Sequence, residues 1–433
     1  MASDFDERLP EALRNLHPAP RIYAPGVRLL QRRTFDLDLR ATISPLDVEC
    51  WLLGAASKTA SAHALTEGFA SRLAQAGLGV ARLSLNVGTL HPLAYGYAWN
   101  WNTLDGICDE IQIGEETLLS GEFRENPIFR VVEFGEVVRV TLLPANADAR
   151  SPLMEELAVA GFSEYVAIPL SASGEKYNAV TLATQQAGGF AQAQYDTLMR
   201  LLDIFALHVE RHIVSRIAHN ISHTYLGRQA GERVVNGTIK RGSGLSIRAI
   251  VWSSDMRDFS RLSERHDNRT VADVLNSYFS VLAEAVIRHD GDVLKFVGDG
   301  MLAVFPLADF DSPKLAAQAA AAAAREAVRD LDALNREMAL AADWEPLQTG
   351  IGLHLGDVFF GNIGATNRLD FTVIGEAVNI ASRVEGLCKP LKRNVLMSAP
   401  VAAFLGERAE LLGAQHLKGL QKAEQLFALL DGG

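Results

Sequence analysis

Apolar and polar residues follow three different spacings in the second half of the chain, and each spacing predicts one kind of element. An apolar run over residues 247–255 has the length of a buried strand and ends in Asp255. Over residues 270–288 the apolar positions recur every three or four residues, which is typical of an amphipathic helix. Residues 293–305 alternate on either side of a glycine-flanked Asp299, which predicts two strands joined by a tight turn. We therefore expect a β-α-β-β unit with two aspartates at adjacent strand ends.

Two carboxylates at neighbouring strand ends suit hard divalent cations. Mg2+ takes oxygen ligands, and the phosphates of a nucleotide can complete a shell that two aspartates begin. A helix that begins soon after Asp255, near Phe259 and Ser260, would direct free backbone N–H groups at a bound phosphate. Asp-Gly is also the commonest short turn signal, so the hairpin taken alone does not establish a metal site.

A second polar pattern lies further along the chain. Residues 368–383 change from a strand, through Gly375, into a helix that carries Asn379 and Arg383 four positions apart on one face. A guanidinium group matches the geometry of phosphate and keeps its charge at physiological pH. An isolated pair of this kind is otherwise a hydrated helix face, so the interpretation depends on what accompanies it.

The first half of the chain predicts a separate α+β domain. The pattern is helical over residues 46–77, strand-like over 80–85, and strand-like again over 165–170 and 179–184, before a long helix from about residue 191. This order of elements resembles a GAF-type sensory domain, which implies a cavity for an unidentified small-molecule ligand. The residues leave open whether that ligand is a cyclic nucleotide, a chromophore, haem or nothing at all.

The long helix carries two further patterns. Its apolar stripe would suit pairing with the same helix of a second subunit, and consists of Leu202, Ala206, Val209, Ile213 and Ile217. Four histidines, His208, His212, His219 and His223, fall roughly on one face and could bind a metal or haem or sense protons. Packed or solvated histidines are the alternative, just as Trp99 and Trp101 could line a ligand cavity or belong to the core. A glycine-punctuated stretch up to Gly244 then predicts a linker or hinge.

Composition narrows the class of protein. At 433 residues and 48% hydrophobic content, the chain can form two or three domains, and its formal charge of −11 argues against a general nucleic-acid binder. Three widely spaced cysteines, Cys50, Cys108 and Cys388, predict neither a disulfide framework nor a zinc cluster and fit a reducing cytoplasm. We expect no membrane span, and we expect the alanine-rich run over residues 316–324 to pack closely against a neighbouring element.

Several motifs in one order resemble a known family. Residues 296–300, Phe-Val-Gly-Asp-Gly, and residues 371–383, which run from Phe-Thr-Val-Ile-Gly to Ala-Ser-Arg, are similar to the two signature stretches of class III adenylate/guanylate cyclases. Residues 417–420, Leu-Lys-Gly-Leu, resemble the closing motif of that domain. The resemblance implies a ferredoxin-like, palm-type βαββαβ catalytic domain.

The resemblance also assigns roles to residues. It implies that Asp255 and Asp299, with Met256 beside them, hold two Mg2+ or Mn2+ ions. It implies a further set of two catalytic residues, Asn379 and Arg383, and five substrate-binding residues, Phe259, Ser260, Lys295, Thr372 and Lys418. In this set Lys295 and Thr372 would read the base, Asn379 would orient the ribose, Arg383 would stabilise the α-phosphorus and Lys418 would hold the terminal phosphates.

Hydrogen-bond polarity favours adenine. The Watson–Crick edge of adenine offers an acceptor and a donor, which Lys295 and Thr372 can satisfy, whereas guanine presents the reverse. We therefore expect ATP to be converted to cyclic AMP. Thr372 stands where aspartate is common in the family, and the threonine variant resembles a subgroup that bicarbonate stimulates.

The resemblance implies a homodimer, because in the family the metal aspartates and the Asn/Arg helix reach one site from opposite subunits. We expect an N-terminal extension over residues 1–45, a GAF-like domain over 46–190, a signalling helix and linker over 191–244, and the catalytic domain over 245–433. The alternatives are a guanylate cyclase or a non-catalytic ATP-binding signalling module. A diguanylate cyclase is disfavoured because its Gly-Gly-Asp/Glu-Glu-Phe signature is absent from the hairpin.

Overall fold

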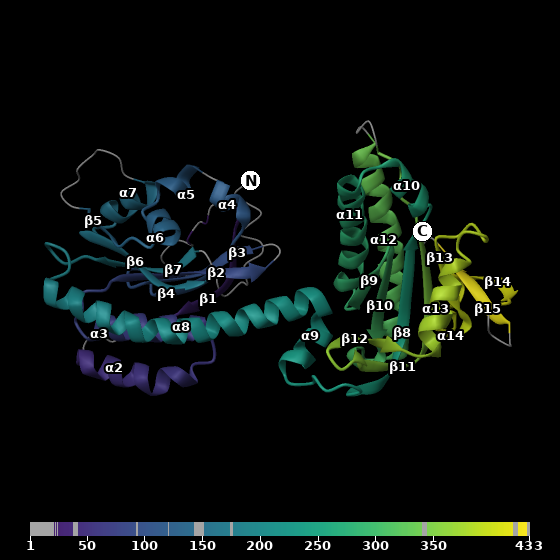
Figure 1. Ribbon diagram of the computed structural model, residues 1–433, viewed down its shortest axis with the longest axis horizontal. Coiled ribbons are helices and arrows are strands. Elements are labelled where there is room, and N and C mark those ends of the chain that lie inside the picture. The colour runs from purple at the N-terminus through teal and green to yellow at the C-terminus, as the bar shows by residue number, and fades with distance from the viewer. Residues whose placement is uncertain are drawn as a thin grey trace. The chain divides into compact units, whose positions relative to one another are not determined.

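The computed structural model describes residues 21, 23, 25–37, 42–91, 94–119, 121–142, 151–173, 176–339, 344–418 and 423–430 (Figure 1). It forms two compact units, Met1–Ile221 and Ser222–Gly433. The division falls inside the long helix α8 (Gln192–Leu226), so the predicted helix-and-linker segment is shared between the two units. Both units mix helices with sheets, as the sequence predicts.

The first unit is an α+β domain on a seven-stranded antiparallel sheet with the order β1-β4-β3-β2-β7-β6-β5. Its strands are β1 (Val27–Thr34), β2 (Arg82–His91), β3 (Ala94–Asn102), β4 (Ile107–Ile113), β5 (Val138–Thr141), β6 (Glu164–Ser173) and β7 (Lys176–Thr184). Strand β1 pairs with β4 at the sheet edge, although the prediction set residues 1–45 apart from the domain. Only long-range pairing reveals this strand, because its sequence is polar and alternates weakly.

Helices cover both faces of this sheet (Figure 1). On one face lie α2 (Pro45–Leu53), α3 (Ala62–Gln75) and α8, and on the other α4 (Glu115–Leu119), α5 (Gly121–Glu125), α6 (Ile128–Phe134) and α7 (Pro152–Val159). The helix predicted over residues 46–77 is broken in two, with the 3-10 turn η2 (Ala55–Lys58) between the parts. The break has a local cause, because Gly54 ends the first helix and Ser61 caps the second by accepting a hydrogen bond from the N–H of Ala64.

Burial in the core of the first unit decides two questions that the sequence left open: the role of Trp99 and Trp101, and the role of the apolar stripe on α8. Trp99 and Trp101 are 1% and 0% exposed, and Trp101 stacks on Phe35 with ring centroids 5.1 Å apart, so both belong to the core. The predicted stripe on α8 also packs inward, since Leu202 and Ile213 are buried in the same cluster. The expectation that this stripe pairs with a second subunit is therefore wrong, because its apolar face is covered by the sheet of its own unit.

The second unit contains an eight-stranded sheet with the order β14-β15-β13-β11-β8-β10-β9, and β12 pairs with β11. The strands are β8 (Gly244–Met256), β9 (Asp292–Val297), β10 (Gly300–Pro306), β11 (Thr349–Ala365), β12 (Arg368–Ile374), β13 (Val395–Ser398), β14 (Ala409–Gln415) and β15 (Glu424–Leu429). The helices are α9 (Arg228–Val235), α10 (Phe259–Arg265), α11 (Asn268–Arg288), α12 (Pro313–Met338), α13 (Glu376–Gly386) and α14 (Ala399–Ala402), with the 3-10 turns η3 (Leu307–Asp309) and η4 (Gly406–Arg408).

The centre of this sheet has the predicted βαββαβ arrangement. Strands β8, β9, β10 and β11 are joined through α11 and α12, and they lie in the spatial order β11-β8-β10-β9. Alternate residues of β8 divide between two cores: Ile250 and Trp252 face α11 and α12, whereas Ala249 and Val251 face α13. Both faces are covered, which explains why this strand reads as one continuous apolar run.

Helices α11 and α12 pack against each other on one face of the sheet (Figure 1). The alanine-rich part of α12 is buried along its length, as predicted, because small side chains allow close approach. Among the described residues, α11 is the one helix that is long and apolar enough to cross a membrane by length and composition alone. That is weak support for a span, since Tyr278, Leu282 and Val286 of α11 lie in this core.

Candidate active site

The hairpin between β9 and β10 brings the two predicted metal aspartates together. Gly300 pairs with both Val297 and Asp255, so only Gly298 and Asp299 form the turn, beside the end of β8. Gly298 has a φ of 62°, which a two-residue turn of this kind requires and which glycine adopts without strain. The backbone N–H of Met256 donates to the carbonyl of Asp299 at 3.3 Å and fixes the turn against β8.

The two carboxylates interact directly. Three effects together raise the pKa of Asp255 to about 6: partial burial is the largest, and the neighbouring charge of Asp299 and a hydrogen bond between the two side chains act in the same direction. Two carboxylates that share a proton are arranged to share a cation instead, because a divalent ion would relieve the repulsion that now favours protonation. Carboxylate oxygens are also the donors that Mg2+ and Mn2+ prefer, so the pair fits the predicted ions.

The end of β8 is anchored from the core. Tyr278 of α11 shares a hydrogen bond of 2.8 Å with Thr349, and the Thr349 hydroxyl lies 3.3 Å from the carbonyl of Asp255. Tyr278 is fully buried and Thr349 is 2% exposed. This buried chain of hydroxyls holds the backbone that carries the first aspartate.

A third carboxylate, which sequence reasoning missed, lies close to the pair. Gly350 is the register partner of Asp255, and a Cβ at Gly350 would come within 2.6 Å of Glu385 Oε1. Burial, together with the charges of Asp255 and Asp299, raises the pKa of Glu385 to about 7. The motif around residue 383 offered no signal for this role, since the proximity depends on how α13 crosses β8 and β11. Among the described residues, no group of three or more His, Cys, Asp or Glu side chains is close enough to form a metal site without a substrate.

The predicted base-reading residues form a second cluster, on β9 and β12. Lys295 Nζ donates to Asp370 Oδ2 at 2.9 Å, and Asp370 lies two residues before Thr372 on the same face of β12. The Thr372 hydroxyl is buried and has no hydrogen-bond partner among the described residues. A buried hydroxyl without a hydrogen-bond partner is costly. We therefore infer that a bound ligand supplies the hydrogen-bond partner of Thr372. Asp370 is a further residue that the sequence analysis did not single out.

Asn379 and Arg383 lie on α13, as predicted, but not beside the aspartates. At about 100° per residue, Arg383 is only about 40° from Asn379 around the helix, whereas Glu385 is about 200° beyond Arg383. Glu385 marks the side of α13 that faces Asp255. Within the described residues, no hydrogen bond or ion pair joins Asn379 or Arg383 to either aspartate. In one chain, therefore, Asn379 and Arg383 lie on a different side of α13 from the two aspartates.

The remaining predicted residues lie around these clusters. Met256 is buried, and Phe259 and Ser260 begin the short helix α10 after Asp258, which has a left-handed φ of 59°. Lys418 is exposed and follows Leu417, which packs in one cluster with Ile380 and Val384 of α13. Residues 419 and 420 of the closing motif lie outside the described residues.

The four histidines of α8 do not converge. His208 Nε2 lies 2.8 Å from the carbonyl of Leu52, and His219 Nδ1 lies 2.8 Å from the carbonyl of Ser215. His212 lies near Thr59, and burial lowers its pKa to about 4. His223 instead lies 3.4 Å from Glu232. Different partners hold the four rings apart, so the structure does not support the suggested shared metal or haem site. The three cysteines are free, as expected.

Comparison with known proteins identifies the second unit. Residues 248–430 match the family model described as "Adenylate and Guanylate cyclase catalytic domain". This region is therefore a class III adenylate/guanylate cyclase catalytic domain. The α+β unit that precedes it is not identified as a GAF-type domain, so that resemblance stays a prediction.

Several curated relatives are adenylate cyclases. The chain is 30% identical over 196 residues to the terminal-differentiation specific adenylate cyclase of Dictyostelium discoideum, covering 44% of this chain and 9% of that protein. It is 32% identical over 181 residues to adenylate cyclase 1 of Rhizobium meliloti (strain 1021), covering 41% and 26%. It is also similar to the solved structure of the adenylyl cyclase CyaB from P. aeruginosa, with 25% identity, a TM-score of 0.40, and coverage of 44% of this chain and 97% of that one. The chain spans about a quarter or less of the length of these two curated relatives.

Proposed function

We propose that the chain is an adenylate cyclase that converts ATP to 3′,5′-cyclic AMP and pyrophosphate. The observation that carries the proposal is the pair Asp255 and Asp299, which the register of three strands holds in hydrogen-bond contact at one end of the sheet of a cyclase catalytic domain. The pair supplies the acidic oxygen ligands that in-line phosphoryl transfer requires. The curated relatives named adenylate cyclase support the proposal further.

In this mechanism the chain positions groups and compensates charge. Two Mg2+ or Mn2+ ions held by Asp255 and Asp299 would supply a lowered pKa for the ribose 3′-hydroxyl and positive charge beside the departing pyrophosphate. Asn379 orients the ribose so that its 3′-hydroxyl faces the α-phosphorus of the same molecule. Arg383 donates to the phosphate oxygens in the transition state, and Lys418 holds the terminal phosphates.

The base is selected by the cluster on β9 and β12. The ammonium group of Lys295 donates to N1 of adenine, and the Thr372 hydroxyl accepts from the amino group N6. Two observations support this assignment: Asp370 holds Lys295 beside Thr372, and the Thr372 hydroxyl is buried without a partner among the described residues. A guanine would present a donor to the lysine and an acceptor to the hydroxyl, which leaves the lysine facing an unsatisfied N–H.

We propose that two chains form each active site. The acidic pair and Glu385 occupy one side of α13, and Asn379 and Arg383 occupy another, so a complete set needs Asn379 and Arg383 from a second copy. A surface on α8 also supports association of two copies. Leu207, Val214 and Ile221 recur every seven residues and are 67%, 60% and 40% exposed, which is the spacing of a coiled-coil seam. This seam is a different face of α8 from the buried stripe.

The first test is identification of the product. Purified full-length chain is incubated with ATP or GTP and with Mg2+ or Mn2+, and nucleotides are separated by chromatography and mass spectrometry. We expect cyclic AMP and pyrophosphate from ATP and little cyclic GMP from GTP. Cyclic GMP as the main product would favour a guanylate cyclase, which the family model also covers. Bound ATP that is never turned over would favour the non-catalytic signalling module.

The second test separates the shared site from a site within one chain. Asp299→Ala and Arg383→Ala are each expected to lower activity by about 100-fold or more. When the two variants are co-expressed, half of the dimers are mixed and each has one intact site, so about a quarter of the wild-type activity should return. Asp273→Ala, at an exposed position of α11, serves as the control and should keep full activity. A mixture as inactive as its components would exclude the shared site.

We propose that the N-terminal unit regulates this activity. Helix α8 leads from its core into the catalytic unit without a break, and α9 then packs against Asp292 at the start of β9. A change in the first unit that alters the pairing of α8 would thereby reach the strand that carries Lys295. Removal of residues 1–221 should leave cyclase chemistry detectable but change its rate or its dependence on chain concentration, and an unchanged rate would argue against regulation.

A further inference from the structure

A cavity of about 220 Å³ lies within the N-terminal unit, apart from the proposed active site. It is lined by β2 and β3 on one side and by residues of the α4–α6 segment and α7 on the other. Figure 1 shows this helical layer on the face of the sheet opposite α8. Side chains of β2 point to opposite faces of the sheet: Leu83 and Leu85 enter the main core, whereas Arg82 and Asn86 face the cavity.

Arg82 is the unusual member of this lining. Its side chain is partly buried at the cavity wall, and burial lowers its pKa because the charged form loses hydration. Among the described residues, no carboxylate lies within ion-pair distance of Arg82. The charge of Glu156 contributes a weaker favourable field, and the charge of Arg21 opposes it. Burial also raises the pKa of Tyr165 to about 12, so its hydroxyl stays neutral and cannot balance the charge.

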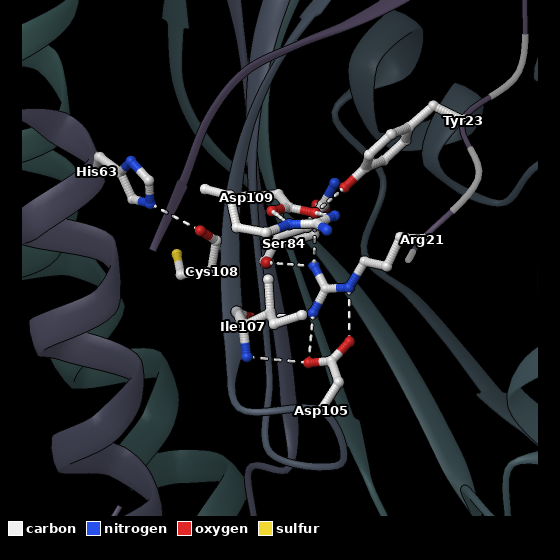
Figure 2. A network of polar contacts seen from close by, with 10 residues as sticks. Arg21, Tyr23, His63, Ser84, Asp105, Ile107, Cys108 and Asp109 are labelled. Atoms are coloured by element: carbon white, nitrogen blue, oxygen red, sulfur yellow. Dashed lines mark hydrogen bonds and ion pairs between the residues drawn. The ribbon is translucent and has the colours of Figure 1, made fainter. Parts of the chain in front are cut away.

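Two other arginines of this domain, Arg21 and Arg32, are each paired with an aspartate. Figure 2 shows Arg21 beside Asp105. The Arg21 guanidinium group donates two hydrogen bonds of 2.7 Å to the Asp105 carboxylate and one of 3.0 Å to the carbonyl of Ile107. Arg32 donates to Asp109 at 2.7 Å and 2.8 Å, and Asp109 is completely buried. Both structural arginines therefore have a dedicated aspartate, whereas Arg82, two strands away, has none among the residues that the structure describes.

A partly buried cation without a counter-ion is costly, and proteins retain one where a ligand completes it. The other residues that line the cavity indicate the chemical character of that ligand. Ile113, Phe123, Val132 and Tyr177 give the cavity apolar and aromatic walls, so the ligand has an apolar body as well as an anionic head. The volume is below the roughly 300–1,000 Å³ of pockets for drug-sized ligands, which favours a small metabolite over a nucleotide or a tetrapyrrole.

We propose that this cavity binds a small organic anion, with Arg82 donating to its carboxylate or phosphate group and the aromatic wall packing on its body. The polar side chains beside Arg82 are held in place by hydrogen bonds to one another. Ser84 Oγ donates to Asn100 Oδ1 at 2.6 Å, and Asn86 Nδ2 donates to Ser84 Oγ at 3.0 Å. The assignment is independent of the cyclase chemistry, because all of these residues belong to the first unit.

The test uses the full chain, purified without phosphate, and measures binding by calorimetry and by the shift in melting temperature. The probes are benzoate, phenyl phosphate and the neutral analogue benzamide. We expect one or both anions to bind and to raise the melting temperature, and benzamide to do neither. Benzoate alone would identify a carboxylate ligand and phenyl phosphate alone a phosphate ester. Failure of both anions to bind would overturn the proposal.

Variants locate the binding. Arg82→Met should weaken anion binding about 10- to 100-fold, while Arg28→Met, an exposed arginine of β1, should leave it unchanged. Without ligand, Arg82→Met should melt at the same temperature as the wild type or higher, because the substitution removes an uncompensated charge. A clearly lower melting temperature would show that Arg82 is structural.

A second variant keeps Arg82 and fills the cavity. Gly88 lines the cavity on β2, and a Cβ there would meet no atom within 4 Å, so Gly88→Val adds a side chain in open space. We expect Gly88→Val to fold normally and to lose the response to both anions. A folded Gly88→Val variant that binds the probes as tightly as the wild type would place binding elsewhere and refute the assignment.

Discussion

Asp292 provides a stability prediction with a definite sign. It is the first residue of β9 and is 3% exposed, and its carboxylate accepts hydrogen bonds from the backbone N–H groups of Arg228 and Gln229 at the start of α9. Its Oδ2 atom has no partner among the described residues. Burial outweighs the two hydrogen bonds and raises the pKa of Asp292 from 3.8 to about 6. The ionised carboxylate is thus tolerated in the folded protein at a cost.

The perturbation is Asp292→Asn, which keeps an acceptor for the two N–H groups and removes the charge. The rise in pKa from 3.8 to about 6, at about 1.4 kcal/mol per pH unit, corresponds to at most about 3 kcal/mol. Because the folded pKa is the higher one, the wild type has its full stability below pH 4 and loses this contribution as the pH rises through 6. The variant does not titrate there, so it should match the wild type at pH 4 and exceed it by up to about 3 kcal/mol at pH 8.

The assay is hydrogen exchange of peptides from β9 and β10 in increasing urea, which reports the second unit separately from the first. Asp311→Asn, at an exposed position, is the control and should show no pH-dependent difference. If Asp292→Asn opens more easily than the wild type at pH 8, the carboxylate stabilises the contact between α9 and β9 as an anion, and the reasoning from burial is refuted.

Two further predictions concern the candidate active site. Asp370→Asn should change the free energy of unfolding by less than about 1 kcal/mol, because the ion pair of Asp370 with Lys295 is exposed. The same substitution should raise KM for ATP and reduce discrimination against GTP. Unchanged steady-state kinetics would contradict the role of Asp370 in positioning Lys295. Glu385→Gln should weaken Mn2+ binding several-fold at pH 8 and much less at pH 6, because the pKa of Glu385 is about 7 and its charge reaches Asp255 only above that pH. Mn2+ titrations followed by electron paramagnetic resonance test this, and equal losses at both pH values would show that the charge is not the cause.

The sequence determined the part of the site that depends on neighbours along the chain. The hairpin that carries Asp299 is a two-residue turn between short strands, so alternation and two glycines are enough to define it. Once the strand ending in Asp255 was recognised, a βαββ connection left few ways to arrange the two aspartates. The four-residue spacing of Asn379 and Arg383 likewise fixed their common face, because helical geometry is local.

Tertiary structure decided which surface meets which partner. Periodicity identified an apolar stripe on α8, but only the packed sheet shows that Leu202 and Ile213 serve their own unit while Leu207 and Val214 remain exposed. Glu385 comes close to Asp255 only through the crossing of α13 over the sheet. An ion pair or an unpaired charge is a property of residues distant in sequence, so no local pattern could distinguish Arg82 from arginines that have an aspartate of their own.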